Sequence, residues 1–450
     1  MFYDQKDAEG QWRYYRDPEV MASVHATAYV GAMDFAFETY QSLIEPMQEF
    51  YKGQKPLAEA EYDVNGDGVK EHLADLTDEG DIKAFKRTYN ADIRTKACDT
   101  LRALLPIATK THVGIMGNGR FFQWVISHCM ASPIREVRDI AEQTLAELGK
   151  VIPTYVKRAR ASEYTIATNL GLAELARELF SGITSLPAVD RNDNNGECVD
   201  LLDRGEEFIA ARCAAAPGDA GVLRTVLRDE EDTLTMACAL YPYVSLPLQQ
   251  IRETVRGFSS EVRTQILKTL VGERKTRRDR PARSLEAGYP YTFDMCTDFG
   301  TYKDLMRHRM STQLRQPFTP VVGFAMPEDL VTAGFANKAQ VVHERMMVLY
   351  ELLKVEFPAA ASYATLHGSL VRWVMGLNDR SAMHLIELRT TPQGHPSYRR
   401  VAALMHDAIS ARSAWRGAAM QFADHGVYGW ARGDAEAKQR VKEKALDAQK

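Results

Sequence analysis

Residues 378–400 read NDRSAMHLIELRTTPQGHPSYRR, and the rest of the chain is interpreted from this stretch. Its first half has apolar residues at helical spacing, and Pro392 and Gly394 end the predicted helix. Asn378 and Arg389 are eleven residues apart, which in a helix is about three turns and roughly 16 Å. The helix would therefore present both polar groups on nearly the same face, an arrangement suited to an extended anionic ligand. An amphipathic core helix with charged ends shows the same pattern.

A second stretch repeats the first. Residues 118–138 read NGRFFQWVISHCMASPIREVR, so Asn-x-Arg opens both stretches, 260 residues apart (378 minus 118). An apolar helix and then a basic helical stretch, around Arg138 or Arg399, follow in each. Cys129 stands where the second copy has Arg389. The sequence thus predicts two related halves, of which only the second keeps the distal arginine.

Composition narrows the class of protein. The chain has 450 residues, 45% of them hydrophobic and 26% charged, which is typical of a globular protein with two to four domains. A net charge of −4 argues against nucleic-acid binding, and no apolar run approaches the roughly 20 residues of a membrane span. Six scattered cysteines without a CxxC pair favour the reducing cytoplasm. His, Asp and Glu residues at metal-binding spacing are not found, so no metal is predicted.

The expected domain boundaries follow from composition shifts. Residues 1–190 form a mostly helical, N-terminally incomplete half, and the Asn/Asp-rich residues 191–220 form a linker. Residues 221–432 form the second half, and residues 433–450 form a charged tail. Within the second half, residues 289–295 alternate aromatic with other residues, which predicts a strand.

Two clusters of cations precede the helix at 378–389. Residues 273–283 read ERKTRRDRPAR, and Arg307-His308-Arg309 places two fixed cations around one titratable group. Arginine binds phosphate through two parallel hydrogen bonds, so with Arg380 and Arg389 these clusters suit a dianionic or pyrophosphate ligand. Solvated charge runs have the same composition. Neither a glycine-rich dinucleotide loop nor a P-loop is present.

The combination of Arg-His-Arg with a later Asn-x-Arg helix resembles flavin-dependent thymidylate synthases, the ThyX family. In that family the signature RHRxxSxxxxSxR lines the flavin site, and the later helix places an Asn and an Arg on the flavin and a distal Arg on the uracil of dUMP. The resemblance implies FAD binding by Arg307, His308, Arg309, Asn378 and Arg380. It also implies that Arg389 activates the nucleotide and that Arg399 helps to bind it.

The chain departs from the family signature at several positions. The two serines are Thr312 and Pro317, the last arginine is Thr319, and Gly288 replaces a flavin-contacting histidine. The pattern resembles a longer, tandem branch, in which the chain would begin just after an ExSTRY-type stretch of the first repeat.

The resemblance implies an α+β, predominantly helical fold of two ThyX-like repeats, the second with a small antiparallel sheet. The implied reaction is reductive methylation of dUMP to dTMP with FAD, NADPH and methylenetetrahydrofolate. A homodimer would form a pseudo-tetramer. The alternatives are a catalytically impaired flavin- or nucleotide-binding homologue, an enzyme of altered pyrimidine C5 chemistry that acts on another pyrimidine nucleotide, and a helical interaction protein.

Overall fold

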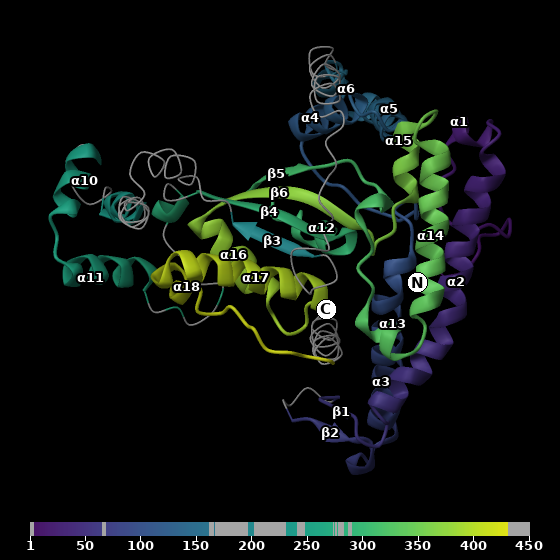
Figure 1. Ribbon diagram of the computed structural model, residues 1–450, viewed down its shortest axis with the longest axis horizontal. Helices are drawn as coiled ribbons and strands as arrows, with labels where there is room; N and C mark the ends of the chain where they lie inside the picture. The colour runs from purple at the N-terminus through teal and green to yellow at the C-terminus, as the bar shows by residue number, and fades with distance from the viewer. Residues whose placement is uncertain are drawn as a thin grey trace, which may run out of the picture.

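The computed structural model describes residues 4–64, 69–161, 166, 197–201, 231–240, 248–272, 274, 277, 283–286 and 290–430. Helices predominate, and a four-stranded antiparallel sheet lies in the second half of the chain (Figure 1). The predicted α+β, mostly helical class is therefore confirmed. The expected tail, residues 433–450, lies outside the described residues.

The first half is built from long helices and one short hairpin. Its elements are α1 (Pro18–Met21), α2 (Ala26–Gln54), β1 (Glu61–Tyr62), β2 (Glu71–His72), η2 (Leu73–Asp75), α3 (Glu79–Leu101), η3 (Arg102–Leu104), α4 (Gly119–Met130), α5 (Arg135–Val151) and α6 (Pro153–Val156).

The second half contains the sheet and the helices around it. Its elements are β3 (Cys198–Leu201), a helical segment at 231–240, α10 (Leu248–Arg256), α11 (Ser260–Val271), η6 (Arg283–Glu286), β4 (Pro290–Asp298), α12 (Phe299–Leu305), β5 (Thr312–Arg315), η7 (Pro320–Val322), α13 (Glu328–Thr332), α14 (Ala336–Leu353), α15 (Pro358–Ala361), η8 (Ser362–Ala364), β6 (Leu370–Asn378), α16 (Asp379–Arg389), α17 (Pro396–Arg412) and α18 (Ala414–Ala419).

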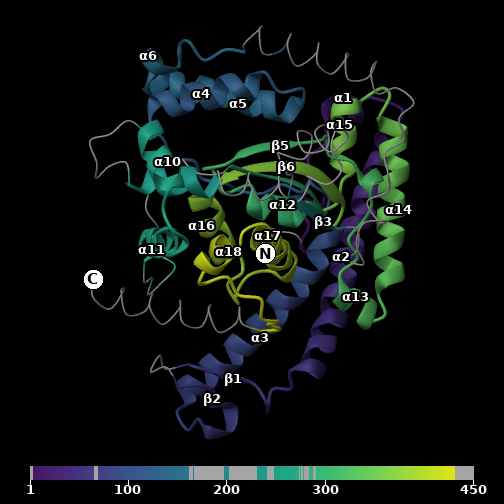
Figure 2. The ribbon, with the colours of Figure 1, turned by 60° about the vertical axis from the view of Figure 1, so that its left-hand side comes forward.

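The sheet has the strand order β3-β4-β6-β5. The aromatic strand predicted at 289–295 is β4, and its buried Tyr291 and Phe293 lie opposite Leu377 and Met375 of β6. Helices α16, α17 and α18 cover one face of the sheet (Figures 1 and 2). The expected linker at 191–220 needs correction, because residues 198–201 within it are β3 and pair along β4.

One hydrophobic core contains side chains from both halves of the sequence. Helix α2 of the first half packs against α14 of the second, and buried side chains from both, such as Phe37 and Val342, belong to one cluster. Figure 1 shows the two helices side by side. The two halves therefore share this core, because each helix buries its apolar stripe against the other.

Backbone contacts of the first half recur in the second. Helices α1 and α2 begin 310 residues before α13 and α14 (328 minus 18, 336 minus 26), and η3 begins 260 residues before η8 (362 minus 102). The matching hydrogen bonds are Tyr15 N to Ala108 O and Ala325 N to Gly368 O, both 2.8 Å, and Lys110 N to Arg13 O and Leu370 N to Gly323 O, both 2.9 Å.

The halves meet at a reciprocal contact. The amide of Ile107 donates to the carbonyl of Thr365, and the amide of His367 donates to the carbonyl of Leu105, each at 2.8 Å. With the 260-residue offset, each of these bonds is the counterpart of the other. A local twofold relation therefore passes through the bridge between Pro106 and Leu366.

The halves differ after this contact. Residues 370–378 form β6, the strand between β4 and β5, whereas their counterparts at 110–117 are in no strand and are exposed. Both segments end in the same way. Asn118 and Asn378 each cap the following helix by accepting a hydrogen bond from the amide three residues later, at 2.9 and 2.8 Å.

Candidate functional site

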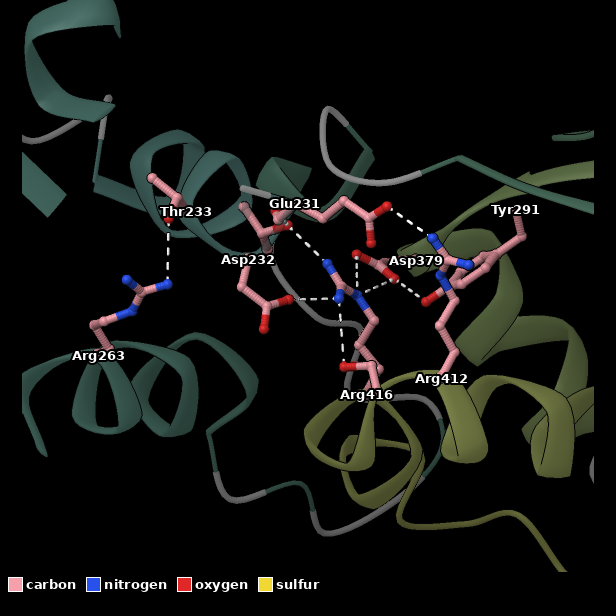
Figure 3. A network of polar contacts seen from close by, with 10 residues as sticks. Glu231, Asp232, Thr233, Arg263, Tyr291, Asp379, Arg412 and Arg416 are labelled. Carbon is pink, nitrogen blue, oxygen red and sulfur yellow. Dashed lines mark hydrogen bonds and ion pairs between the residues drawn. The ribbon is translucent and has the colours of Figure 1, made fainter. Parts of the chain in front are cut away.

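Helix α16 is held at its first residue by a buried ionic network (Figure 3). Asp379, 3% exposed, accepts hydrogen bonds from the hydroxyl of Tyr291 in β4 and from Nε of Arg416 in α18, the latter at 3.1 Å. Arg416 also donates to Asp232 at 2.5 Å and to Thr235 at 3.1 Å. Burial raises the pKa of Asp379, and the Arg416 charge opposes that shift. The network fixes α16 on the sheet.

A second buried pair holds the middle of α16. Both terminal nitrogens of Arg274 donate to the carboxylate of Glu387, at 2.6 and 2.5 Å, and both side chains are almost fully buried. The sequence grouped residues 274–283 as cations for an anionic ligand. For Arg274 this is a correction, because Glu387 neutralises it inside the protein. Residues 275, 276 and 278–282 of that run lie outside the described residues.

The predicted flavin pair lies at the N-terminal end of α16. The side-chain oxygen of Asn378 caps the helix, and the guanidinium of Arg380 forms an ion pair with Glu286 of η6. Both Arg380 and Glu286 are about one quarter exposed (25% and 26%). An anionic ligand at Arg380 would therefore have to displace the Glu286 carboxylate or share the guanidinium with it.

At the other end of α16, the fold brings together two predicted site residues that are 81 positions apart in the sequence (389 minus 308). Nε of Arg389 donates to Nε2 of His308 at 2.8 Å, and the guanidinium lies 5.3 Å from the ring centre of Tyr398. An Nε2 that accepts this bond is unprotonated, so Nδ1 carries the proton. The imidazole thus orients the guanidinium without adding charge.

The remaining predicted residues lie in different surroundings. Arg307 and Arg309 are exposed, and Arg307 is 3.4 Å from Asp304. Arg399 is buried, and it donates to the backbone carbonyls of Thr390 at 2.9 Å and Gly426 at 3.0 Å. In the structure Arg399 thus ties the loop after α16 to the C-terminal segment.

A cavity of 590 Å³ lies between the two halves. It is lined by α3 and η3 of the first half, and by residues 325–329, 367–368, 392–400 and 424–430 of the second. Of the predicted site residues, only Arg399 lines it. Arg102 lines it too, with Nη1 3.7 Å from Asp304 and a buried Nη2 that has no hydrogen-bond partner. Because Asp304 is also close to Arg307, this carboxylate connects the Arg-His-Arg element to the cavity.

Sequence reasoning missed Arg102 and His367. His367 donates from Nδ1 to the carbonyl of Leu105 at 2.8 Å and accepts from Lys303 at 3.2 Å. The Arg102 and His367 side chains come from different halves, and the reciprocal contact around Pro106 and Leu366 places them in one cavity. The repeated Asn-x-Arg motif could have indicated these residues, because two halves related by a local twofold axis must contact each other along that axis.

Two histidines of the site are held neutral. Burial, and then the charge of Arg389 and the neighbouring His384, lowers the pKa of His308 to about 4. Burial, followed by the charge of Lys303, lowers the pKa of His367 to about 3.

We expect acid to destabilise the protein through these two rings. Below the ordinary histidine pKa of 6.5, the unfolded chain binds protons that the folded protein does not accept until about pH 4 or below. Stability conferred by the neutral rings is therefore complete above pH 6.5 and is lost as the pH falls toward 4 for His308 and toward 3 for His367. NMR titration of the imidazole signals, assigned with His308→Gln and His367→Gln, measures this directly. Two signals that titrate near pH 6.5 would contradict it.

The fold and this site define a mostly helical protein whose candidate site lies between two related halves. A model of the family described as thymidylate synthase complementing protein matches residues 2–154 and 232–413, more than half of the chain. The chain belongs to this family.

The chain is also similar to curated proteins and to a solved structure. A UPF0159 protein of Chlamydia muridarum is 30% identical over 406 residues, covering 89% of this chain and 67% of the relative. A UPF0159 protein of Thermoplasma acidophilum is 26% identical over 447 residues, 98% of this chain and 81% of the relative. The crystal structure of a UMP/dUMP methylase, PolB from Streptomyces cacaoi bound with 5-Br dUMP, matches with 15% identity and a TM-score of 0.31, over 50% of this chain and 94% of that chain. Among the described residues, no helix combines the length and the apolar character needed to cross a membrane.

Proposed function

We propose that the protein is a flavin-dependent thymidylate synthase that methylates dUMP to dTMP with methylenetetrahydrofolate and NADPH. The observation that carries the proposal is the contact at 2.8 Å between Arg389 and the neutral His308. It joins the two motifs on which the resemblance rests, and the family match supports a methyltransferase-type enzyme acting on a pyrimidine nucleotide.

Some of the predicted arginines are placed where they could bind the pyrophosphate of FAD. Arg307 and Arg309 are exposed, so Arg309 can turn toward a pyrophosphate and Arg307 can do so by leaving Asp304, 3.4 Å away. Asn378 and Arg380 also have protein partners. In this proposal Arg307, His308 and Arg309 hold the cofactor. Arg380 also binds it, after its ion pair with Glu286 breaks. Bound FAD supplies the redox chemistry of the methylation.

The residues of the chain bind and polarise the nucleotide. Arg389 stabilises the negative charge that develops on a uracil carbonyl, and His308 fixes the direction of its guanidinium. Arg389 does not line the cavity, so in this proposal the uracil lies outside it and the cavity takes the anionic phosphate. Its volume is typical of small-molecule sites, about 300–1,000 Å³, and the unsatisfied Nη2 of Arg102 offers a donor there. Arg399 helps by holding the cavity wall.

The repeated contacts support two copies within residues 1–190 and 221–432, related by the local twofold axis. In this proposal only one of the two equivalent clefts is a site. Ala103 lines the open cavity, whereas its counterpart 260 residues later is Tyr363, which is buried and donates to Glu136 of α5. A homodimer of such chains would be a pseudo-tetramer.

A catalytically impaired, ligand-binding homologue is the second candidate. Thr319, at the position of the signature's last arginine, caps η7 by accepting from the amide of Val321 at 3.1 Å, and Pro317 replaces a serine. Neither residue supplies the donors that the signature has there.

Flavin absorbance of the purified protein, FAD titration and turnover of dUMP with methylenetetrahydrofolate and NADPH test both candidates. We expect FAD and dUMP to bind and dTMP to form. Binding of both without turnover selects the impaired homologue. No FAD binding at tens of micromolar, on the order of 6 kcal/mol, leaves only an interaction protein.

Ala103→Tyr is the matched variant for the cavity, since it installs the side chain found at the equivalent position. We expect it to abolish dUMP binding while the far-UV circular dichroism spectrum stays unchanged. Unaltered dUMP affinity in a folded Ala103→Tyr protein would show that the nucleotide does not bind in this cavity.

A further inference from the structure

Two histidines and an aspartate meet where helix α17 contacts the C-terminal segment 420–430. Nδ1 of His406 in α17 lies 2.8 Å from Nε2 of His425, and Nδ1 of His425 lies 3.9 Å from the carboxylate of Asp407. One ligand atom from each residue falls within 4.8 Å of the others. The sequence predicts no metal site, because His425 is 18 residues beyond Asp407 (425 minus 407) and the two come together only through the turn after α18.

The protein fixes the tautomer of His406. Its Nε2 lies 3.1 Å from the carbonyl of Gly417, which accepts and cannot donate, so Nε2 carries the proton. Nδ1 of His406 is then unprotonated, and its lone pair is directed at His425. A backbone carbonyl on the opposite ring nitrogen is the usual means by which proteins orient a metal-binding imidazole.

The geometry points to a binding site for a divalent transition metal of the zinc type, formed by His406, Asp407 and His425. Two imidazoles and one carboxylate are ligands that zinc accepts, and an exposed cluster leaves the fourth position to water. Ligand atoms of a tetrahedral zinc ion lie roughly 3.3 Å apart, so the 2.8 Å separation of the two imidazole nitrogens needs only a small opening. A metal ion would replace the proton that now lies between the rings.

Such an ion would fasten the segment that closes the cavity. Residues 424–430 line the cavity, and Trp430 crosses to the first half, where its ring packs edge-on against Tyr51 at 5.7 Å. Arg399 already holds the carbonyl of Gly426, and Thr390 accepts from the amide of Asp424 at 3.0 Å. Metal at His425 therefore adds an attachment to α17 beside these bonds.

Titration of the full-length, untagged, metal-free protein with Zn²⁺ by calorimetry tests the site. We expect one equivalent to bind more tightly than about 10 µM, and Co²⁺ to give the visible absorption of a tetrahedral complex. His406→Gln and His425→Gln should each weaken binding at least tenfold. His112→Gln, an exposed histidine of the first half, is the control and should bind as the parent does.

Chymotrypsin digestion gives a second measurement. Phe422, Tyr428 and Trp430 are its targets in the segment, and we expect Zn²⁺ to slow cleavage there in the parent and in His112→Gln but not in His425→Gln. Binding weaker than 10 µM would show that the histidines only share a proton. Binding that survives both His→Gln substitutions would place the ion elsewhere, and either result overturns the site.

Discussion

Arg389→Ala is expected to abolish turnover and to weaken dUMP binding roughly tenfold to a hundredfold, while FAD content stays unchanged. Removal of one charge-assisted hydrogen bond costs about 1.5–3 kcal/mol, which corresponds to that range. Arg389 lies at the C-terminal end of α16, and the proposed flavin pair Asn378 and Arg380 lies at its start. Substitutions at the two ends of α16 should therefore impair different ligands, dUMP at the C-terminal end and FAD at the start.

Arg380→Ala is the matched variant on the same helix, and it should lose flavin first. Fluorescence titration with FAD and equilibrium dialysis with labelled dUMP measure the two affinities. In Arg389→Ala the pKa of His308 should also rise, because the Arg389 charge is one cause of its depression. If Arg389→Ala loses FAD while dUMP binding survives, the roles assigned to the two ends of α16 are reversed.

Local features of this fold could be predicted from the sequence. The helix at 378–389 and the strand at 289–295 correspond to α16 and β4, because apolar spacing and the Pro392-Gln393-Gly394 ending act within a few residues. The repeated Asn-x-Arg was equally local, since an asparagine cap needs only the amide three residues later.

The site depended on contacts that no local pattern encodes. Both the pairing of Arg274 with Glu387 and the cavity neighbours Arg102 and His367 join residues more than 100 positions apart. Whether an arginine faces a ligand or a buried carboxylate is decided by tertiary packing. For the same reason β3 could not be separated from the loop composition around it, because its partner residues in β4 are 92 to 98 positions away (293 minus 201, 296 minus 198).

Arg416→Ala is expected to cause the largest loss of stability, about 3–5 kcal/mol. The substitution leaves Asp379, 3% exposed, without its cation and deprives Asp232 and Thr235 of a donor (Figure 3). A buried carboxylate without a partner is costly because protein cannot replace its hydration. Urea unfolding measures the loss, and Arg120→Ala, an exposed arginine of the Asn-x-Arg motif in the first half, should stay within about 0.5 kcal/mol of the parent.

The pH dependence of that loss identifies Asp379 as its source. Its folded-state pKa is already raised by burial, and removal of Arg416, which opposes the shift, raises it further. A raised carboxyl pKa makes the folded protein bind the proton more strongly than the unfolded chain, so the penalty is full above the folded-state pKa and disappears as the pH falls to the ordinary value of 3.8. Arg416→Ala should thus be closest to the parent in acid, and Arg416→Ala/Asp379→Asn should recover part of the loss at neutral pH. A deficit that is independent of pH and unchanged in the double variant would mean that packing around Arg416, and not the buried charge, holds α16 on the sheet.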